Sequence, residues 1–203
     1  MILPWRNITM KYLIISGNPK KDGLCDSIMQ EVIRGAKEGG AEVSVLSTQD
    51  IPRCHICGEG WGSCISSHIC AFGNDGFTEA QKQVASADAY CIITPVYWGE
   101  VSESLKAFID RLRRCEATKQ WSREAGAVKS AFAGKQALLV ASPGGSGNGA
   151  LSCLQQMERF CQHTGAAIFD HIGINRWNHN YKAKAAYEAA KAMAAGRTVG
   201  TTV

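Results

Sequence analysis

Hydrophobic positions follow two different periods in turn along the chain. Short apolar runs of strand length recur, most of them closed by turn-forming residues, a pattern typical of buried parallel strands. Longer stretches between them place apolar residues three and four positions apart, which predicts amphipathic helices. The predicted strands are 12–15, 42–46, 89–94, 136–141 and 166–172. The predicted helices are 25–37, 102–114 (with Ser102 as N-cap), 149–163 and 182–195.

Five strands interleaved with helices predict a doubly wound α/β sheet. We expect residues 11–196 to form its single domain, 1–10 to be a leader that need not be ordered, and 197–203 to fray. Two stretches lack clear periodicity: 52–76, which is rich in Gly and Cys, and 117–133, which is polar. Ligands of such sheets bind at the carboxyl ends of the strands, so the loops after the first, third and fourth strands are the candidate site.

Composition narrows the function classes. Of 203 residues, 45% are hydrophobic and 20% charged, which excludes wholesale disorder and a fibrous chain. No apolar run reaches the ~18 residues that span a bilayer, so we expect no membrane partner. The formal charge of +4 is mild and its basic residues are spread apart from Arg111, Arg113 and Arg114, which disfavours nucleic-acid binding. No secretory apolar region is seen near the start, so a reducing cytoplasm is expected, where nine cysteines indicate thiols, metal ligands or redox chemistry.

The first candidate loop runs from Ser16 to Cys25 and leads directly into a helix. Backbone N–H groups, the helix dipole and the side chains of Asn18 and Lys20 would bind an anion there, most naturally a phosphate. The glycine spacing matches neither a dinucleotide fingerprint nor a P-loop. An ordinary strand-to-helix turn is the alternative.

The other two loops offer surfaces for a planar group. Tyr97 and Trp98 follow the third strand and can form a flat apolar wall, with peptide groups beside it for a polar ring edge; simple packing is the alternative. Four glycines between Pro143 and Ala150 follow the fourth strand and permit close approach of a ring, unless the loop is merely flexible. Together the three loops predict a ligand with a phosphate at one end and a polar-edged ring at the other.

Three sequence blocks carry a family resemblance, which extends over about residues 11–172. They read ISGNPKKDGLC, TPVYWGEVSESLKAFIDR and SPGGSG. They resemble the NADPH-dependent FMN reductase and iron–sulfur flavoprotein branch of the flavodoxin-like superfamily. The resemblance implies strand order 2-1-3-4-5, with FMN phosphate over 18–27 and the isoalloxazine against 95–100 and 142–145.

The resemblance implies a set of FMN-binding residues, and no catalytic acid or base, because the flavin carries the chemistry. The set is Ser16, Asn18, Lys20, Leu24, Cys25, Ser27, Pro95, Val96, Tyr97, Trp98, Gly99, Glu100, Ser142, Gly144 and Gly145. In the first loop Asn18, Lys20, Leu24 and Cys25 replace the family's Ser, Arg, Asn and Thr. The lost Thr hydroxyl would have to be compensated by backbone amides or by Ser27. Asp110 and Arg111 match the family's helix and are interpreted as structural pairing or solvent-facing groups.

Four thiols gather in the glycine-rich stretch: Cys54, Cys57, Cys64 and Cys70. Four thiolates suit a [4Fe–4S] cluster or a structural zinc, and the spacing is equally open to a redox-active pair at the first two or to free packed thiols. Iron–sulfur flavoproteins carry a cluster at this place, with two residues between the second and third cysteines where this chain has six. The remaining cysteines are predicted to be buried as small hydrophobes, and His55 and His68 to lie on the loop surface.

We therefore expect an FMN-dependent oxidoreductase that passes electrons from NAD(P)H or a reduced carrier to a quinone, flavin or protein acceptor. One alternative relays electrons between a [4Fe–4S] cluster and FMN. Two hypotheses belong to another class: a non-enzymatic electron carrier, which the positive charge disfavours, and a metal-stapled interaction module. The resemblance also implies a homodimer or homotetramer, with 52–76 and 117–133 at subunit contacts.

Overall fold

The computed structural model describes residues 9–55, 57, 64, 67–72, 74–117 and 129–197. The expectations for the leader and the tail, and for most of 117–133, therefore lie almost wholly outside the described residues, as does part of the cysteine-rich stretch.

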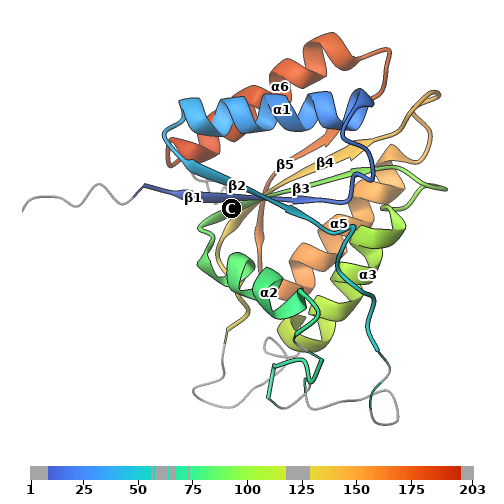
Figure 1. The fold of residues 1–203 in the computed structure, drawn as a ribbon. Helices are drawn as coiled ribbons and strands as arrows, with labels where there is room; N and C mark the ends of the chain where they lie inside the picture. The colour runs from blue at the N-terminus through green and yellow to red at the C-terminus, as the bar shows by residue number, and fades with distance from the viewer. Residues whose placement is uncertain are drawn as a thin grey trace, which may run out of the picture.

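One five-stranded parallel sheet forms the centre of the protein, in the order β2-β1-β3-β4-β5 (Figure 1). The strands are β1 Lys11–Ser16, β2 Glu42–Ser47, β3 Ala89–Pro95, β4 Gln136–Ser142 and β5 Ala167–Gly173. Every neighbouring pair is parallel. This confirms the doubly wound fold class and the flavodoxin-like strand order.

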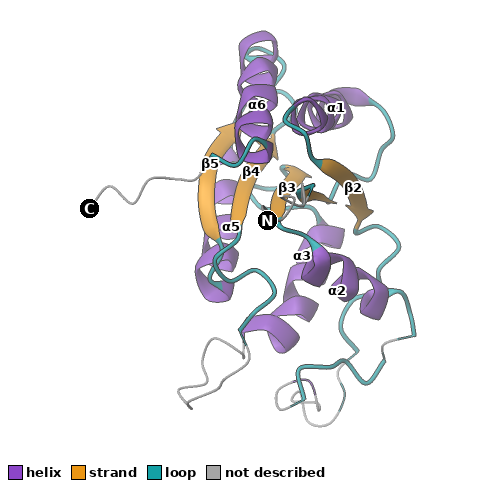
Figure 2. Ribbon diagram, turned by 90° about the vertical axis from the view of Figure 1, so that its left-hand side faces the viewer, coloured by secondary structure: helices purple, strands orange, loops and turns teal. Residues whose placement is uncertain are grey.

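Helices cover both faces of the sheet, as the two views show (Figures 1 and 2). One face carries α1 Gly23–Glu38 and α6 His179–Ala194, and the other carries α2 Phe77–Ser86, α3 Glu103–Leu112 and α5 Ala150–Thr164. Along β1, side chains alternate between the two cores: Leu13 and Ile15 face the α3 side, and Tyr12 and Ile14 the α1 side. None of the described helices is long and apolar enough to cross a membrane.

Two local features differ from the sequence-based prediction. Helix α2 was not predicted, because its buried face consists only of Phe77, Ala80 and Val84 among polar residues, and tertiary packing rather than periodicity stabilises it. Helix α3 begins at Glu103 as expected but continues beyond Leu112 as a π-helical turn, Arg113–Ala117. Such turns often occur at functional sites.

Candidate functional site

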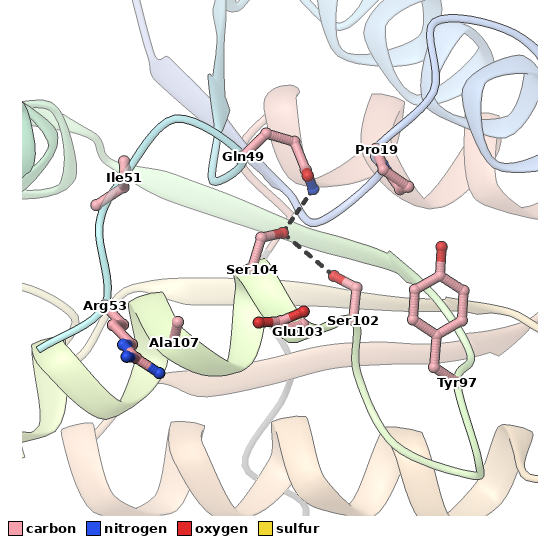
Figure 3. A pocket seen from close by; sticks show the side chains of 9 residues that line it. All are labelled: Pro19, Gln49, Ile51, Arg53, Tyr97, Ser102, Glu103, Ser104 and Ala107. Atoms are coloured by element: carbon pink, nitrogen blue, oxygen red, sulfur yellow. Dashed lines mark hydrogen bonds between the residues drawn. The ribbon is translucent and has the colours of Figure 1, made fainter.

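A cavity of about 450 Å³ opens at the carboxyl ends of β1, β2 and β3. The chain leaves β1 toward α1 on one face and leaves β3 toward α3 on the other, so a crevice opens between the two loops. This is the topological switch point at which doubly wound sheets bind ligands. Figure 3 shows its lining, which is Pro19, Gln49, Ile51, Arg53, Tyr97, Ser102, Glu103, Ser104 and Ala107.

Hydroxyl and amide groups join the elements around this cavity. The Ser102 Oγ donates to the Gly17 carbonyl at 2.7 Å, so Ser102 occupies the N-cap position of α3 without capping that helix. The Gln49 Nε2 donates to the Gly17 carbonyl at 3.3 Å and to the Ser104 Oγ at 2.6 Å. The Thr48 and Ser104 hydroxyls lie 2.9 Å apart. These bonds hold the first loop against the start of α3 and leave a polar lining (Figure 3).

The first loop presents backbone donors rather than side-chain donors. Asn18 organises the turn, with its Nδ2 donating to the Lys20 carbonyl at 2.6 Å. Asp22 stands at the N-cap of α1 but makes no side-chain capping bond. The first-turn N–H groups of α1 thus lack that acceptor, and such a helix start is suited to a phosphate.

The side chains that follow this loop do not replace the missing Thr hydroxyl. Burial raises the pKa of the Cys25 thiol to about 12, and this thiol packs in the core beneath α1, as Leu24 does in part. The Ser27 Oγ donates to the Leu24 carbonyl at 2.8 Å and lies 3.1 Å from the His179 Nε2 on α6. Ser27 also lines a separate groove between α1 and α6. Of the two compensations expected from the sequence, the backbone amides are the ones this geometry offers.

A two-residue hairpin turn forms the second loop. Tyr97 and Glu100 exchange both backbone hydrogen bonds at 2.9 Å, and Trp98 and Gly99 have φ values of 54° and 83°. Positive φ at both central residues defines a type I′ turn, which is uncommon for tryptophan. Tyr97 lines the cavity, whereas the Trp98 side chain is fully exposed, so the two aromatics do not form one wall.

The third loop lies beside the second, as expected from the strand order. The Val96 N–H donates to the Ser142 carbonyl at 3.2 Å. Gly149 lies so close to the second loop that a Cβ there would be 2.5 Å from the Gly99 Cα. Around Gly144, in contrast, a Cβ would meet no atom within 4 Å, so this stretch can receive a flat group. Residues 142–145 do not line the described cavity itself.

Several residues at this edge were missed by the sequence analysis. Gln49, Ile51 and Arg53 follow β2, and that loop was not considered although parallel pairing places it beside β1. The β5–α6 loop also contributes: the Trp177 Nε1 donates to the Gly145 carbonyl at 3.0 Å. The available signal was the expected strand order, which brings the second strand's end to the same crevice.

The predicted cysteine group lies next to this cavity. Arg53 lines both the cavity and an adjoining hollow formed with Pro52, Cys54 and His55. Cys64 is buried, and Cys54, Cys57 and Cys70 are partly buried.

The four thiols interact electrostatically. Burial raises the pKa of Cys54 and of Cys64, and the neighbouring thiols raise both further. Among the described residues, no group of three His, Cys, Asp or Glu side chains is arranged to hold a single metal ion. A cluster spaces its thiolate ligands more widely than a single ion does, because irons and sulfides lie between them. The thiols therefore fit a cluster better than a mononuclear zinc.

Comparison with known proteins agrees with this architecture. The sequence pattern of the NADPH-dependent FMN reductase family matches residues 10–178. An iron-sulfur flavoprotein from Methanosarcina thermophila is 32% identical over 104 residues, which are 50% of this chain and 52% of that protein. The chain thus spans about half the length of the curated relatives it matches.

Solved structures share the fold at low identity. An NAD(P)H:quinone oxidoreductase from Methanothermobacter marburgensis superposes with a TM-score of 0.70 at 16% identity, covering 95% of this chain and 100% of that one. An FMN-dependent NADH-azoreductase from Bacillus anthracis, in complex with FMN, gives 0.64 at 15% identity, with 92% and 100% covered. Since the family pattern extends over most of the chain and through all three strand-end loops, this chain belongs to the NADPH-dependent FMN reductase family.

Proposed function

We propose that this chain binds FMN at the crevice between β1 and β3 and uses it to pass electrons from NAD(P)H or a reduced carrier to an acceptor such as a quinone, a flavin or a protein. The observation that carries the proposal is the cavity of about 450 Å³ at the switch point, with the start of α1 beside it. Membership of the FMN reductase family supports the same ligand.

The residues present fit FMN in three ways. The loop from Ser16 to Lys20 and the first-turn N–H groups of α1 would hold the phosphate, aided by the lysine charge. Tyr97 would flank the ring, and the open backbone at Gly144 would admit it without a steric clash. The N–H groups of Trp98 and Gly99 have no protein acceptor among the described residues, so they can donate to a polar ring edge.

The protein's own contribution to the reaction is position and electrostatics. FMN, when bound, supplies the hydride and electron chemistry. The turn at Trp98 and Gly99 would orient the ring by donating from a rigid backbone, and such donors favour negative charge where it develops. Tyr97 would exclude water from one side of the ring. No side chain is needed as an acid or base.

The cysteine group carries a second proposal, that Cys54, Cys57, Cys64 and Cys70 bind a [4Fe–4S] cluster that exchanges electrons with FMN. Their mutual electrostatic contact and their position beside the cavity support it. So does the name of the iron-sulfur flavoproteins that match part of the chain. When assembled, the cluster supplies single-electron transfer.

Organisation and assembly are proposals as well. We propose that residues 11–196 form one FMN-binding domain acting in a reducing cytoplasm, and that the chain forms a homodimer or homotetramer through 52–76 and 117–133. Light scattering coupled to gel filtration tests the assembly. A monomer at every concentration would refute it.

The deciding experiment is anaerobic purification followed by absorbance spectra, FMN titration and NAD(P)H turnover. We expect two flavin bands, saturable FMN binding and turnover. Gly144→Val should weaken FMN binding while leaving the thermal midpoint of the FMN-free protein unchanged, because the position is open in the fold. A folded protein that takes up no FMN refutes the proposal. FMN binding without NAD(P)H oxidation indicates an electron carrier, and metal without FMN indicates a metal-stapled module.

A further inference from the structure

Arg111 is the largest fully buried side chain of the protein, with 1% of its surface exposed. It lies in the last turn of α3, on the side that packs toward the cysteine-rich stretch. A charge removed from water costs several kcal/mol unless it is paired and hydrogen-bonded. Its neighbour Asp110 is exposed and pairs with Lys106 on the same helix, so the two residues of this family block have different environments.

The guanidinium of Arg111 binds both ends of the segment 52–76. One Nη1 bond reaches the Pro52 carbonyl at 3.0 Å, where the segment begins. Toward the other end, Nη2 donates to the Phe72 carbonyl and to the Asp75 Oδ1, both at 3.0 Å, and Nη1 lies 2.8 Å from the Asp75 Oδ2. One planar group thus connects the points where the segment leaves the sheet and where it returns.

Asp75 extends this connection into the next helix. Its Oδ1 accepts the Phe77 N–H at 3.2 Å, at the start of α2, and its Oδ2 lies 3.5 Å from the His55 Nε2. The Arg111 guanidinium also stacks over the Phe77 ring, 4.2 Å from its centre. Because these contacts come from a rigid fork, lysine could not reproduce them with its single nitrogen.

Arg111 also touches a candidate ligand directly. Its Nη2 lies 3.2 Å from the Cys70 Sγ and donates to it. Its Nε has no hydrogen-bond partner among the described residues, so a further buried donor remains at this place. Other charges that act on the thiols are Arg114, toward Cys54 and Cys64, and Glu116, toward Cys115.

We propose that Arg111 is the positioning residue of the candidate cluster: it closes the cysteine segment into its binding shape, and its hydrogen bond to Cys70 Sγ raises the cluster's reduction potential. This rests on the proposed [4Fe–4S] function. The direction follows because a buried cation and an N–H···S bond stabilise the more negative, reduced state of the cluster.

The test compares Arg111→Met and Arg111→Lys with Arg113→Met, which removes an exposed arginine two positions along the same helix. Iron and acid-labile sulfide per chain, the cluster potential from a dye-mediated redox titration, and FMN binding are measured for each. Arg111→Met should retain the cluster about 10- to 100-fold more weakly, the usual effect of losing a group that orients ligands. Arg111→Lys should recover part of the iron, at a potential below wild type.

The outcomes separate this proposal from those on which it rests. Wild-type iron content and potential in both Arg111 variants would overturn it, as would equal losses in Arg113→Met. If Arg111→Met does not fold, as lost FMN binding would show, the potential of Arg111→Lys decides. A wild-type protein that binds FMN but takes up no iron after anaerobic reconstitution overturns the cluster role and leaves the FMN function standing. A wild type that binds neither refutes the proposed function itself.

Discussion

Gly149, at the start of α5, joins two of the three loops, so replacing it by alanine tests the local geometry of the site. Gly149 has a φ of +78°, a region that costs an L-residue about 1–2 kcal/mol. An added Cβ would lie 2.5 Å from the Gly99 Cα and 3.1 Å from the Gly99 nitrogen. Both are backbone atoms of the hairpin turn, so the overlap cannot be relieved by rotating a side chain.

The expected magnitude combines strain and overpacking. Overpacking adds about 1–3 kcal/mol, so Gly149→Ala should lower the free energy of unfolding by about 2–5 kcal/mol. At about 2–4 °C per kcal/mol for a domain of this size, the thermal midpoint should fall by roughly 4–20 °C. FMN affinity should also fall, because the displaced turn carries the N–H groups of Trp98 and Gly99.

A matched control separates the two contributions. Gly134 has a φ of +75°, but a Cβ there would meet no atom within 4 Å. Gly134→Ala should therefore show the conformational cost alone, about 1–2 kcal/mol, without loss of FMN affinity. Urea and thermal denaturation followed by circular dichroism measure both variants. Equal destabilisation by the two would refute the close packing of α5 against the turn.

Three further changes have defined outcomes. Ser102→Ala should cost about 1–2 kcal/mol in urea denaturation because it removes the buried bond to the Gly17 carbonyl, whereas Ser86→Ala, at an exposed hydroxyl, should be near neutral; equal effects would contradict this. Trp98→Asn should raise the thermal midpoint, by about 1 kcal/mol of stability, since asparagine before glycine suits a type I′ turn and the exposed indole loses no packing; a lower midpoint would refute the strain argument. Burial raises the pKa of Cys25 to about 12, so its contribution to stability is complete below the unfolded thiol pKa and is lost as pH rises toward 12; Cys25→Ala should show a shallower fall of urea midpoints from pH 9 to 12, and an unchanged slope would contradict this.

The periodicity of the sequence was sufficient for the sheet. Apolar runs such as Tyr12–Ile15 are buried on both faces of a parallel strand, so their continuous hydrophobicity identifies them. Element bounds agree within a few residues for every predicted strand and helix. Helix α2 was missed because its buried face is only three residues, and tertiary packing stabilises it where local pattern is weak.

The candidate site divides along the same line. Because parallel strands end at one edge, the sequence alone determined that the loops after β1, β3 and β4 would meet, and it marked the glycine-rich and cysteine-rich stretches. It could not determine which way a side chain turns. Only the tertiary structure directed the Cys25 thiol into the core, left Trp98 in solvent and brought Gln49 into the cavity.

Arg111 shows the physical reason most clearly. A basic residue at the end of a helix is usually solvated, and the sequence around it contains nothing that contradicts this. Its burial depends on Pro52, Phe72 and Asp75, which lie 59, 39 and 36 positions away along the chain. Local pattern determines which residues form strands and helices, whereas the partners of a buried charge are decided by contacts that exist only once the whole chain has folded.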